Sequence, residues 1–392
     1  MPGLVGGFGK YKFSYLREHK GLIIRNSVIK KDLSCILPNL QWNGVKKGSI
    51  GLNFKILKHP LFTYSFSSFC FNNLVIKRNI YSNTSIFLLT DSNFDIGPYL
   101  AGLIEGDGTI AVHNIRSISK KYNPKIIIIF KKADLPLANY LQKLINCGQV
   151  YIKPNRGYVL WQIQDLVGVY RILWIINGYM RTPKIIGMHL AIDWLNNYII
   201  KNCNSKIAST ISILNKIGKL ECKPLDTSPL DSNSWFSGFT DSDGNFSINI
   251  HKRSNINNTR VQLYYRLEIK QNYHKINSYS LNGSFFPIMS EIGLFLGVTV
   301  YSRSRLIKDK IFNSYTVITH NKTSLSRITD YFNKYPLLSS KYLDYKDWKL
   351  ILDLQNSNKL TSSYLDKAII IRKDFNTTRT TFTWNHLTQS KA

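Results

Sequence analysis

Two segments of the chain repeat one pattern of hydrophobic and polar positions. In each segment a short apolar helix is expected to lead through an acidic residue and a glycine into a strand of alternating polarity. The first helix is predicted to begin at 95–98 and to end at Gly108, and the second to begin at 231–234 and to end at Gly244. The strands are predicted at 109–113 and 245–251. The repeat predicts a chain with two related halves.

Both halves continue with further helices and strands. Alternation predicts a strand at 159–163, and helical spacing of apolar residues predicts helices at 134–145, 183–196, 285–296 and 341–354. In the strand after Gly244, Phe246, Ile248 and Ile250 face one side and polar residues face the other. The pattern is that of an α+β protein with antiparallel sheets.

The same pattern gives the domain organisation. Pro224 and Pro229 interrupt the region between the two halves, which is typical of a linker. We expect a loosely structured N-terminal extension at 1–90, a first domain at 91–215, a linker at 216–232, a second domain at 233–355 and a C-terminal tail at 356–392.

Composition narrows the class of partner. Of 392 residues, 44% are hydrophobic, enough for two packed cores, and 52 Lys and Arg against 23 Asp and Glu give a net charge of +29. A surplus this large favours a nucleic acid over a merely soluble basic surface. The five scattered cysteines are typical of free thiols in a reducing compartment and not of a zinc site. The apolar run at 126–130 is too short for a membrane span.

The two copies align without gaps at their centre, 100–108 against 236–244, with acids at matching positions. Small residues in both copies would let two helix backbones approach closely. An acid in the last turn of a helix is unfavourable by about 0.3–1 kcal/mol, so two such helices side by side indicate a site for divalent cations. The alternative is that Asp107 and Asp243 only join helix to strand in Asp-Gly turns, and the duplication argues against it.

The segment 100–108 resembles the motif of the LAGLIDADG homing endonucleases and departs from it at Glu105 and Gly106, whereas 236–244 is more degenerate. The segments 158–163, 177–184, 224–229 and 335–348 also resemble fungal mitochondrial, intron-encoded members. The resemblance covers about residues 95–355. It implies a monomer with two pseudo-symmetric domains whose antiparallel sheets form a saddle in the major groove of double-stranded DNA.

The resemblance also implies a reaction and its residues. The expected activity is a staggered double-strand break in a long target, with Mg²⁺ or another divalent cation. The metal ligands would be Asp107 and Asp243 with the carbonyls of Gly106 and Ser242, while Glu105 and Asp241 would be supporting residues. Lys184 and Lys341 would lie at the scissile phosphates, although either alone is also typical of an ordinary solvated lysine at a helix start.

Contacts with DNA would come from polar strand positions. Gln271 matches a residue that orders water in the family, and Lys132 or Ala133 occupies the corresponding place in the first half. The candidates for DNA contact are His113, Lys131, Arg156, Asn249, His251, Arg266, Lys270 and Gln271.

Residues 1–9 resemble a segment of cytochrome c oxidase subunit I, which implies an intron in that gene and synthesis in the mitochondrial matrix. A phosphate-binding glycine loop is excluded there because no Lys-Ser/Thr pair follows. The family also contains RNA maturases, so an alternative partner is the chain's own intron RNA. A DNA-binding regulator and an inactive copy are further alternatives, and the intact acids argue against the regulator.

Overall fold

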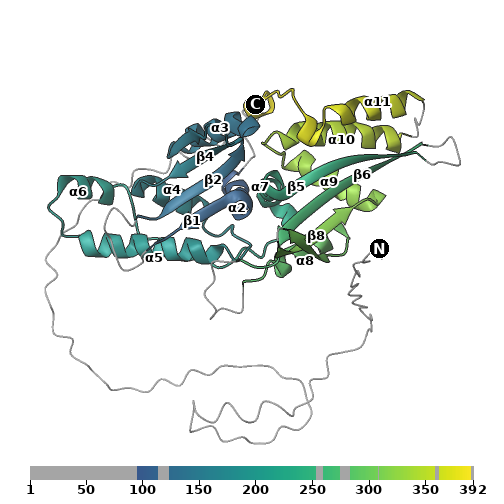
Figure 1. Ribbon diagram of the computed structural model, residues 1–392. Helices are drawn as coiled ribbons and strands as arrows, with labels where there is room; N and C mark the ends of the chain where they lie inside the picture. Colours follow the sequence, from purple (N-terminus) through teal and green to yellow (C-terminus); the bar gives the residue numbers. More distant parts are fainter. Residues whose placement is uncertain are drawn as a thin grey trace, which may run out of the picture. The chain divides into compact units, whose positions relative to one another are not determined.

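The computed structural model describes residues 95–113, 123–252, 259–273, 283–307, 309–357 and 362–389. Two helices, α2 and α7, lie side by side, and each leads into its own four-stranded antiparallel sheet (Figure 1). The predicted α+β class and the duplication are confirmed. The expected N-terminal extension at 1–90 lies outside the described residues.

The first half contains one sheet in the order β1-β2-β4-β3, with every neighbouring pair antiparallel. The predicted helix at 183–196 begins two residues later than expected and runs on to Asn202. The elements are α2 (Ile96–Asp107), β1 (Gly108–Ala111), β2 (Lys125–Lys131), η2 (Lys132–Asp134), α3 (Leu135–Ile145), β3 (Gln149–Ile152), β4 (Tyr158–Ile163), α4 (Leu166–Ile176), α5 (Ile185–Asn202) and α6 (Ala208–Leu214).

The second half repeats this order, and its sheet has the corresponding arrangement β5-β6-β8-β7. The elements are η3 (Leu230–Ser232), α7 (Trp235–Asp243), β5 (Gly244–Lys252), β6 (Thr259–Lys270), α8 (Phe286–Leu296), β7 (Tyr301–Ile307), β8 (Lys310–Thr319), α9 (Lys322–Lys334) and α10 (Lys341–Asn356). The segment at 356–392 contains α11 (Ser362–Lys373), η4 (Asn376–Thr378) and α12 (His386–Gln389).

One face of each sheet packs into the core. In β2, Ile126, Ile128 and Phe130 are buried while the intervening residues face outwards. The second half has a more aromatic core, in which Phe236 stacks on Phe332. Such ring pairs add about 0.5–1.5 kcal/mol each beyond the burial of their area. The outward face of each sheet therefore remains available for a ligand.

The contact between α2 and α7 depends on two glycines. A Cβ atom added at Gly102 would lie 2.1 Å from the carbonyl oxygen of Trp235, and one at Gly238 would lie 1.9 Å from that of Tyr99. These distances are far below van der Waals contact, so only glycine allows the two backbones to come this close. The close approach predicted from the small residues is confirmed.

The helix ends differ in part from the sequence prediction. Asp95 caps α2, with Oδ1 accepting from the backbone N–H of Gly97 at 3.0 Å. Ser234 does not cap α7, because its hydroxyl donates instead to the carbonyl oxygen of Asp95 at 2.8 Å. Both helices end at the predicted glycines, but Gly108 has φ −93° and Gly244 has φ −75°, so neither is a left-handed cap. Close packing is the reason at Gly108, where an added Cβ would lie 2.6 Å from the Cα of Ile104.

The segments outside the two sheets pack against helices of the two halves. Residues 220–223 run along α5, where the side chain of Asn196 bonds both the N–H and the carbonyl of Leu220 and the His189 ring bonds the carbonyl of Lys223. The C-terminal segment contacts the second half: Arg379 forms ion pairs with Asp344 and Asp347, at 2.8 and 2.5 Å. The segment expected as a tail therefore contributes to the packing of α10.

Across the described ranges, no helix combines the length and the apolar character needed to cross a bilayer. Cys147, Cys203 and Cys222 are free thiols, as predicted. Cys35 and Cys70 lie outside the described ranges.

Replacing Gly102 or Gly238 by alanine should push α2 and α7 apart. We expect each variant to lose at least the roughly 1–3 kcal/mol typical of an overpacked core, measured by urea unfolding. Gly187→Ala is the control, because its added Cβ would lie 3.4 Å from the nearest atom and alanine favours the helix. An equal loss in all three variants would contradict the proposed role of the helix contact.

Candidate active site

The last residues of α2 and α7 are Asp107 and Asp243. The carboxylate of Asp243 lies beside the end of α2, because its Oδ2 would be 3.1 Å from a Cβ added at Gly106. Burial, and next the charge of Asp107, raise the pKa of Asp243 to about 6. Desolvation by the surrounding protein also raises the pKa of Asp107, although its side chain is partly exposed. The positive charges of Lys341 and Lys184 oppose that rise. The two acids predicted to meet are therefore brought together.

Each helix end also has a lysine ammonium group. Nζ of Lys184 donates to the carbonyl oxygens of Ile104, Gly106 and Gly108 at 3.1, 2.7 and 2.8 Å. Nζ of Lys341 donates in the same way to Thr240 at 3.0 Å and Ser242 at 2.7 Å. Positive charge at these places compensates the negative end of each helix dipole.

The side chains of both lysines are largely buried. Burial lowers the pKa of Lys184 to about 8, opposed by the charges of Asp243 and Glu105. Burial lowers the pKa of Lys341 as well, and the positive charge of Lys131 adds to this effect. Both lysines therefore contact the helix ends directly and are not ordinary solvated residues. The carbonyl oxygens of Gly106 and Ser242, predicted as metal ligands, each already accept a bond from a lysine, which leaves one lone pair on each.

The first acid of each motif copy is buried and holds the loop that leads to a lysine. Glu105 accepts from the backbone N–H groups of Arg181 at 3.0 Å and Thr182 at 2.6 Å. Asp241 accepts from the backbone N–H groups of Leu338 and Ser339 at 2.8 and 3.1 Å, and from the hydroxyl of Ser339 at 2.5 Å.

Each of these buried acids also accepts a bond from the opposite motif helix. Nε1 of Trp235 donates to Glu105 at 2.6 Å, and the hydroxyl of Tyr99 donates to Asp241 at 2.8 Å. Sequence reasoning did not identify Tyr99 and Trp235. A signal was present, because both immediately precede their motif copies and both are aromatic residues with a polar donor. Each motif helix therefore contacts the acid that holds the loop before the lysine of the other half.

The donor atoms at the helix ends suit a hard divalent cation. They are carboxylate and carbonyl oxygens, the ligands that Mg²⁺ prefers, and they are too few to fill its six positions. Within the residues that the structure describes, no group of three or more His, Cys, Asp or Glu side chains could hold a metal. The acid pair therefore fits a cation whose remaining positions are filled by water and by substrate oxygens.

Two of the predicted DNA-contacting lysines lie near the acid pair. Lys131 and Lys270 end β2 and β6 in equivalent registers, because Ile128 pairs with Gly108 as Leu267 pairs with Gly244. The charge of Lys131 opposes the rise in the pKa of Asp107, and that of Lys270 does the same for Asp243.

The other candidates lie elsewhere on the sheets and loops. Asn249, His251 and Arg266 are on the outward face of the second sheet. His113 follows β1 and Arg156 lies in the turn before β4, and both are exposed. Gln271, for which the resemblance implies a role in ordering water, donates from Nε2 to the hydroxyl of Ser302 at 2.7 Å, and its counterpart by register is Lys132.

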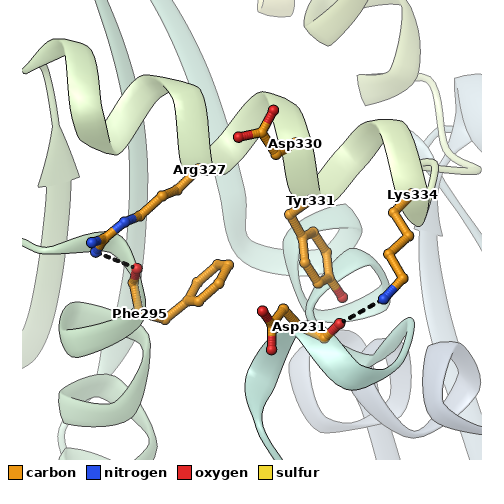
Figure 2. Close-up of a pocket in the computed structure, with 6 residues that line it drawn as sticks. All are labelled: Asp231, Phe295, Arg327, Asp330, Tyr331 and Lys334. Carbon is orange, nitrogen blue, oxygen red and sulfur yellow. Dashed lines mark hydrogen bonds between the residues drawn. The ribbon is translucent and has the colours of Figure 1, made fainter.

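A separate pocket of about 510 Å³ lies between α9, η3 and the end of α8 (Figure 2). Arg327 donates to the carbonyl of Phe295 at 2.8 Å, and Lys334 donates to that of Asp231 at 3.3 Å. Tyr331, which also lines the pocket, donates to the carbonyl of Asn233. The pocket is thus at the amino-terminal end of α7, away from Asp243, and its cations already have backbone partners.

Comparison with known proteins agrees with this geometry. The sequence profile of the family described as LAGLIDADG endonuclease matches residues 100–195 and 236–352. The intron-encoded DNA endonuclease aI3 of Saccharomyces cerevisiae is 47% identical over 309 residues, which is 75% of this chain and 73% of that protein. The cox1 intron-2 37.2 kDa protein of Schizosaccharomyces pombe is 29% identical, over 71% of each chain.

Two solved structures share the fold. The LAGLIDADG homing endonuclease I-GzeII in complex with its DNA target superposes with a TM-score of 0.50 and 18% identity, covering 72% of this chain and 99% of that one. The I-SmaMI LAGLIDADG homing endonuclease bound to cleaved DNA gives 0.50 and 20%, covering 74% and 100%. The matched profile, the relatives and the duplicated acid-bearing helices agree, and the chain belongs to the LAGLIDADG endonuclease family.

Proposed function

We propose that this chain is a Mg²⁺-dependent DNA endonuclease that makes a staggered double-strand break at an intron-insertion site. One observation carries the proposal: two acids lie at abutting helix ends, each with a lysine ammonium on the carbonyls of its own helix. A pair of equivalent centres suits the hydrolysis of two phosphodiester bonds, one on each strand. Because both motif copies are in one chain, we propose that it acts as a monomer.

Double-stranded DNA is the substrate that the charge and the sheets favour. A net charge of +29 provides strong, salt-dependent attraction to phosphates. Each sheet keeps one face free of its core, so both can follow a major groove. The Saccharomyces cerevisiae relative is named a DNA endonuclease, and two solved neighbours are described as bound to DNA.

In this mechanism Asp107 and Asp243 would hold the divalent cations of the two centres, assisted by the carbonyls of Gly106 and Ser242. A bound Mg²⁺ would polarise a phosphate oxygen and favour deprotonation of the attacking water. Lys184 and Lys341 place a positive charge beside the helix ends. Their ammonium groups would stabilise the negative charge that develops on the phosphate in the transition state.

Glu105 and Asp241 act as positioning residues in this scheme. Each carboxylate gathers backbone N–H groups from the loop just before Lys184 or Lys341. The loop is thus fixed to the helix that bears the metal-binding acid. Lysine and acid are thereby held together before substrate binds, which is the preorganisation that electrostatic catalysis needs.

We further propose that the protein acts in mitochondria, in the matrix. The resemblance of residues 1–9 to cytochrome c oxidase subunit I and the name of the Schizosaccharomyces pombe relative support an intron of that gene as its origin. An RNA maturase on its own intron is the second candidate. The acid pair favours cleavage, because RNA binding alone has no need of two carboxylates in a basic surface.

Replacing Asp107 or Asp243 by asparagine should lower the rate of double-strand cleavage by at least about 10³-fold, because a metal-binding charge is lost. DNA affinity should change little. Cleavage is measured as linearisation, in Mg²⁺, of a plasmid that carries the joined-exon sequence. DNA affinity is measured with the same sequence in chelator. Asp231→Asn removes the same charge from the pocket at the other end of α7 and should cleave normally. Equal losses of binding and cleavage would instead indicate a structural role.

The cleavage rate should depend on pH in two directions. With a pKa of about 6 in the metal-free site, Asp243 is increasingly protonated at lower pH and the proton competes with metal, so at subsaturating Mg²⁺ the rate should rise as pH increases through 6. With a pKa of about 8, Lys184 loses its charge at higher pH, so the rate should fall again above 8. Single-turnover rates from pH 5 to 9.5 test this. A constant rate between pH 7 and 9.5 would contradict the role of Lys184.

Tyr99→Phe removes one of the bonds that fix Asp241, at a cost of about 1–3 kcal/mol. Since Asp241 holds only the loop of Lys341, cleavage of one DNA strand should slow more than cleavage of the other. End-labelled strands report both rates. Tyr179→Phe removes a comparable tyrosine bond, of 3.2 Å to Asp95, at the far end of α2 and should slow neither strand. Equal slowing of both strands by Tyr99→Phe would contradict the assignment.

A further inference from the structure

The outward faces of the two sheets differ in chemistry at equivalent positions. The registers make Arg266 equivalent to Ile127 and Glu268 equivalent to Ile129. On the next strands, Thr316 pairs with Glu268 as Leu160 pairs with Ile129. The central outward positions are thus Ile127, Ile129, Leu160 and Gln162 in the first sheet, and Arg266, Glu268, Thr316 and Ile318 in the second.

The second sheet carries a cluster of arginines around one carboxylate. Glu268 forms ion pairs with Arg266 and Arg305, and Nη1 of Arg303 lies 3.8 Å from its Oε2. Its Oε1 also accepts from the hydroxyl of Ser314 at 2.8 Å. The Glu268 side chain is only 16% exposed, whereas the three arginine side chains are 38–47% exposed. The carboxylate is covered, and the guanidinium groups are presented to a ligand.

Guanine is the base that this cluster suits. Arginine donates two bonds to O6 and N7 of guanine in the major groove, and a guanidinium already held by a carboxylate loses less freedom when it binds. Arg303 and Arg305 reach from β7 across β8 to Glu268 on β6, so the guanidinium groups gather over the central strands. The central strands would face the base edges, whereas phosphates lie along the groove walls. Both carboxylate oxygens of Glu268 are already paired with arginines, so the arginines make the contact with the base.

The first sheet presents an apolar surface at the same level. Ile129 is 47% exposed, and Ile127 and Leu160 are partly exposed beside it. Lys125 and Lys131 flank these residues on the same face of β2. An apolar patch between two cations is suited to a ligand with phosphates at its edges and methyl groups at its centre. In DNA the only major-groove methyl group of the common bases belongs to thymine.

We propose that the two halves of the DNA target are read by different chemistry. The half that lies on the first sheet is rich in A·T pairs, whose thymine methyl groups contact Ile127, Ile129 and Leu160. The half that lies on the second sheet contains guanines contacted by Arg266, Arg303 and Arg305, with Glu268 as the residue that orients them. The inference rests on the proposed function for the placement of the sheets in the major groove.

The test begins with binding alone. Full-length protein selects duplexes from a library randomised over both halves, in chelator so that no cleavage occurs. We expect one selected half to be enriched in A·T pairs and the other to contain fixed guanines. Two halves of equal composition would overturn the inference.

Base analogues then assign each half to its sheet. Replacing thymine by deoxyuridine in the A·T-rich half should weaken binding by about 4-fold for each contacted methyl group. Ile129→Ala, whose side chain is exposed and not needed for the core, should abolish this effect at one or more thymine positions. Replacing single guanines by 7-deazaguanine in the other half should weaken binding by roughly 5- to 150-fold, and Arg266→Ala should abolish the effect at one or more guanine positions. Analogue effects that persist at every position in these variants would overturn the assignment.

Glu268→Gln provides a readout that a purely structural role would not move. Removing the carboxylate should reduce the preference for guanine over adenine, while binding to unrelated DNA becomes tighter and more salt-dependent because three arginines are released. Asp330→Asn removes the same charge from α9 and should leave the guanine preference unchanged. A preference unaffected by Glu268→Gln would contradict the orienting role.

These measurements separate the two proposals. A protein that shows the expected base preferences in chelator but never cuts in Mg²⁺ refutes the endonuclease proposal and leaves this inference standing. A protein that cuts its target but shows no difference between the halves refutes this inference alone.

Discussion

The close contact of α2 and α7 is the constraint on which the rest of the structure depends. Gly102 and Gly238 permit each backbone to touch a carbonyl of the other helix, so the helices end together. That meeting gathers two carboxylates and the negative ends of two helix dipoles at one place. The lysine ammonium groups on the last carbonyls are the consequence, since without them this concentration of negative charge would oppose the fold.

The same contact sets the catalytic geometry indirectly. Trp235 and Tyr99, which supply the carbonyls opposite the glycines, also donate side-chain bonds to Glu105 and Asp241. Those acids hold the loops that precede the lysines. Helix packing, loop position and ammonium position are therefore one connected system, and a change in the spacing of the helices would move both lysines. The buried acid of each motif copy thus has a structural role, because it joins the opposite helix to the loop before a lysine.

Local sequence signals predicted some of these features and missed others. Small residues, acids and glycines at fixed spacing sufficed for the motif helices, because these are properties of a short segment. The role of Glu105 depends on Arg181 and Thr182, far along the chain, and no local pattern reveals such partners. The run at 126–130 is apolar at every position, so the sequence has no alternation from which a half-buried strand could be predicted. The structure nevertheless buries only every second residue there.

That apolar run also shows how far the duplication extends. The two halves agree where α2 meets α7, because the helices share one interface and neither copy can change alone. They differ in the core, where the second half is more aromatic, and on the outward faces of β2 and β6, where Ile129 corresponds to Glu268. Each outward face lies outside that shared interface and is free to diverge. A symmetric centre with unlike outward surfaces is the combination that suits the proposed cleavage of both strands of a duplex whose two half-sites differ.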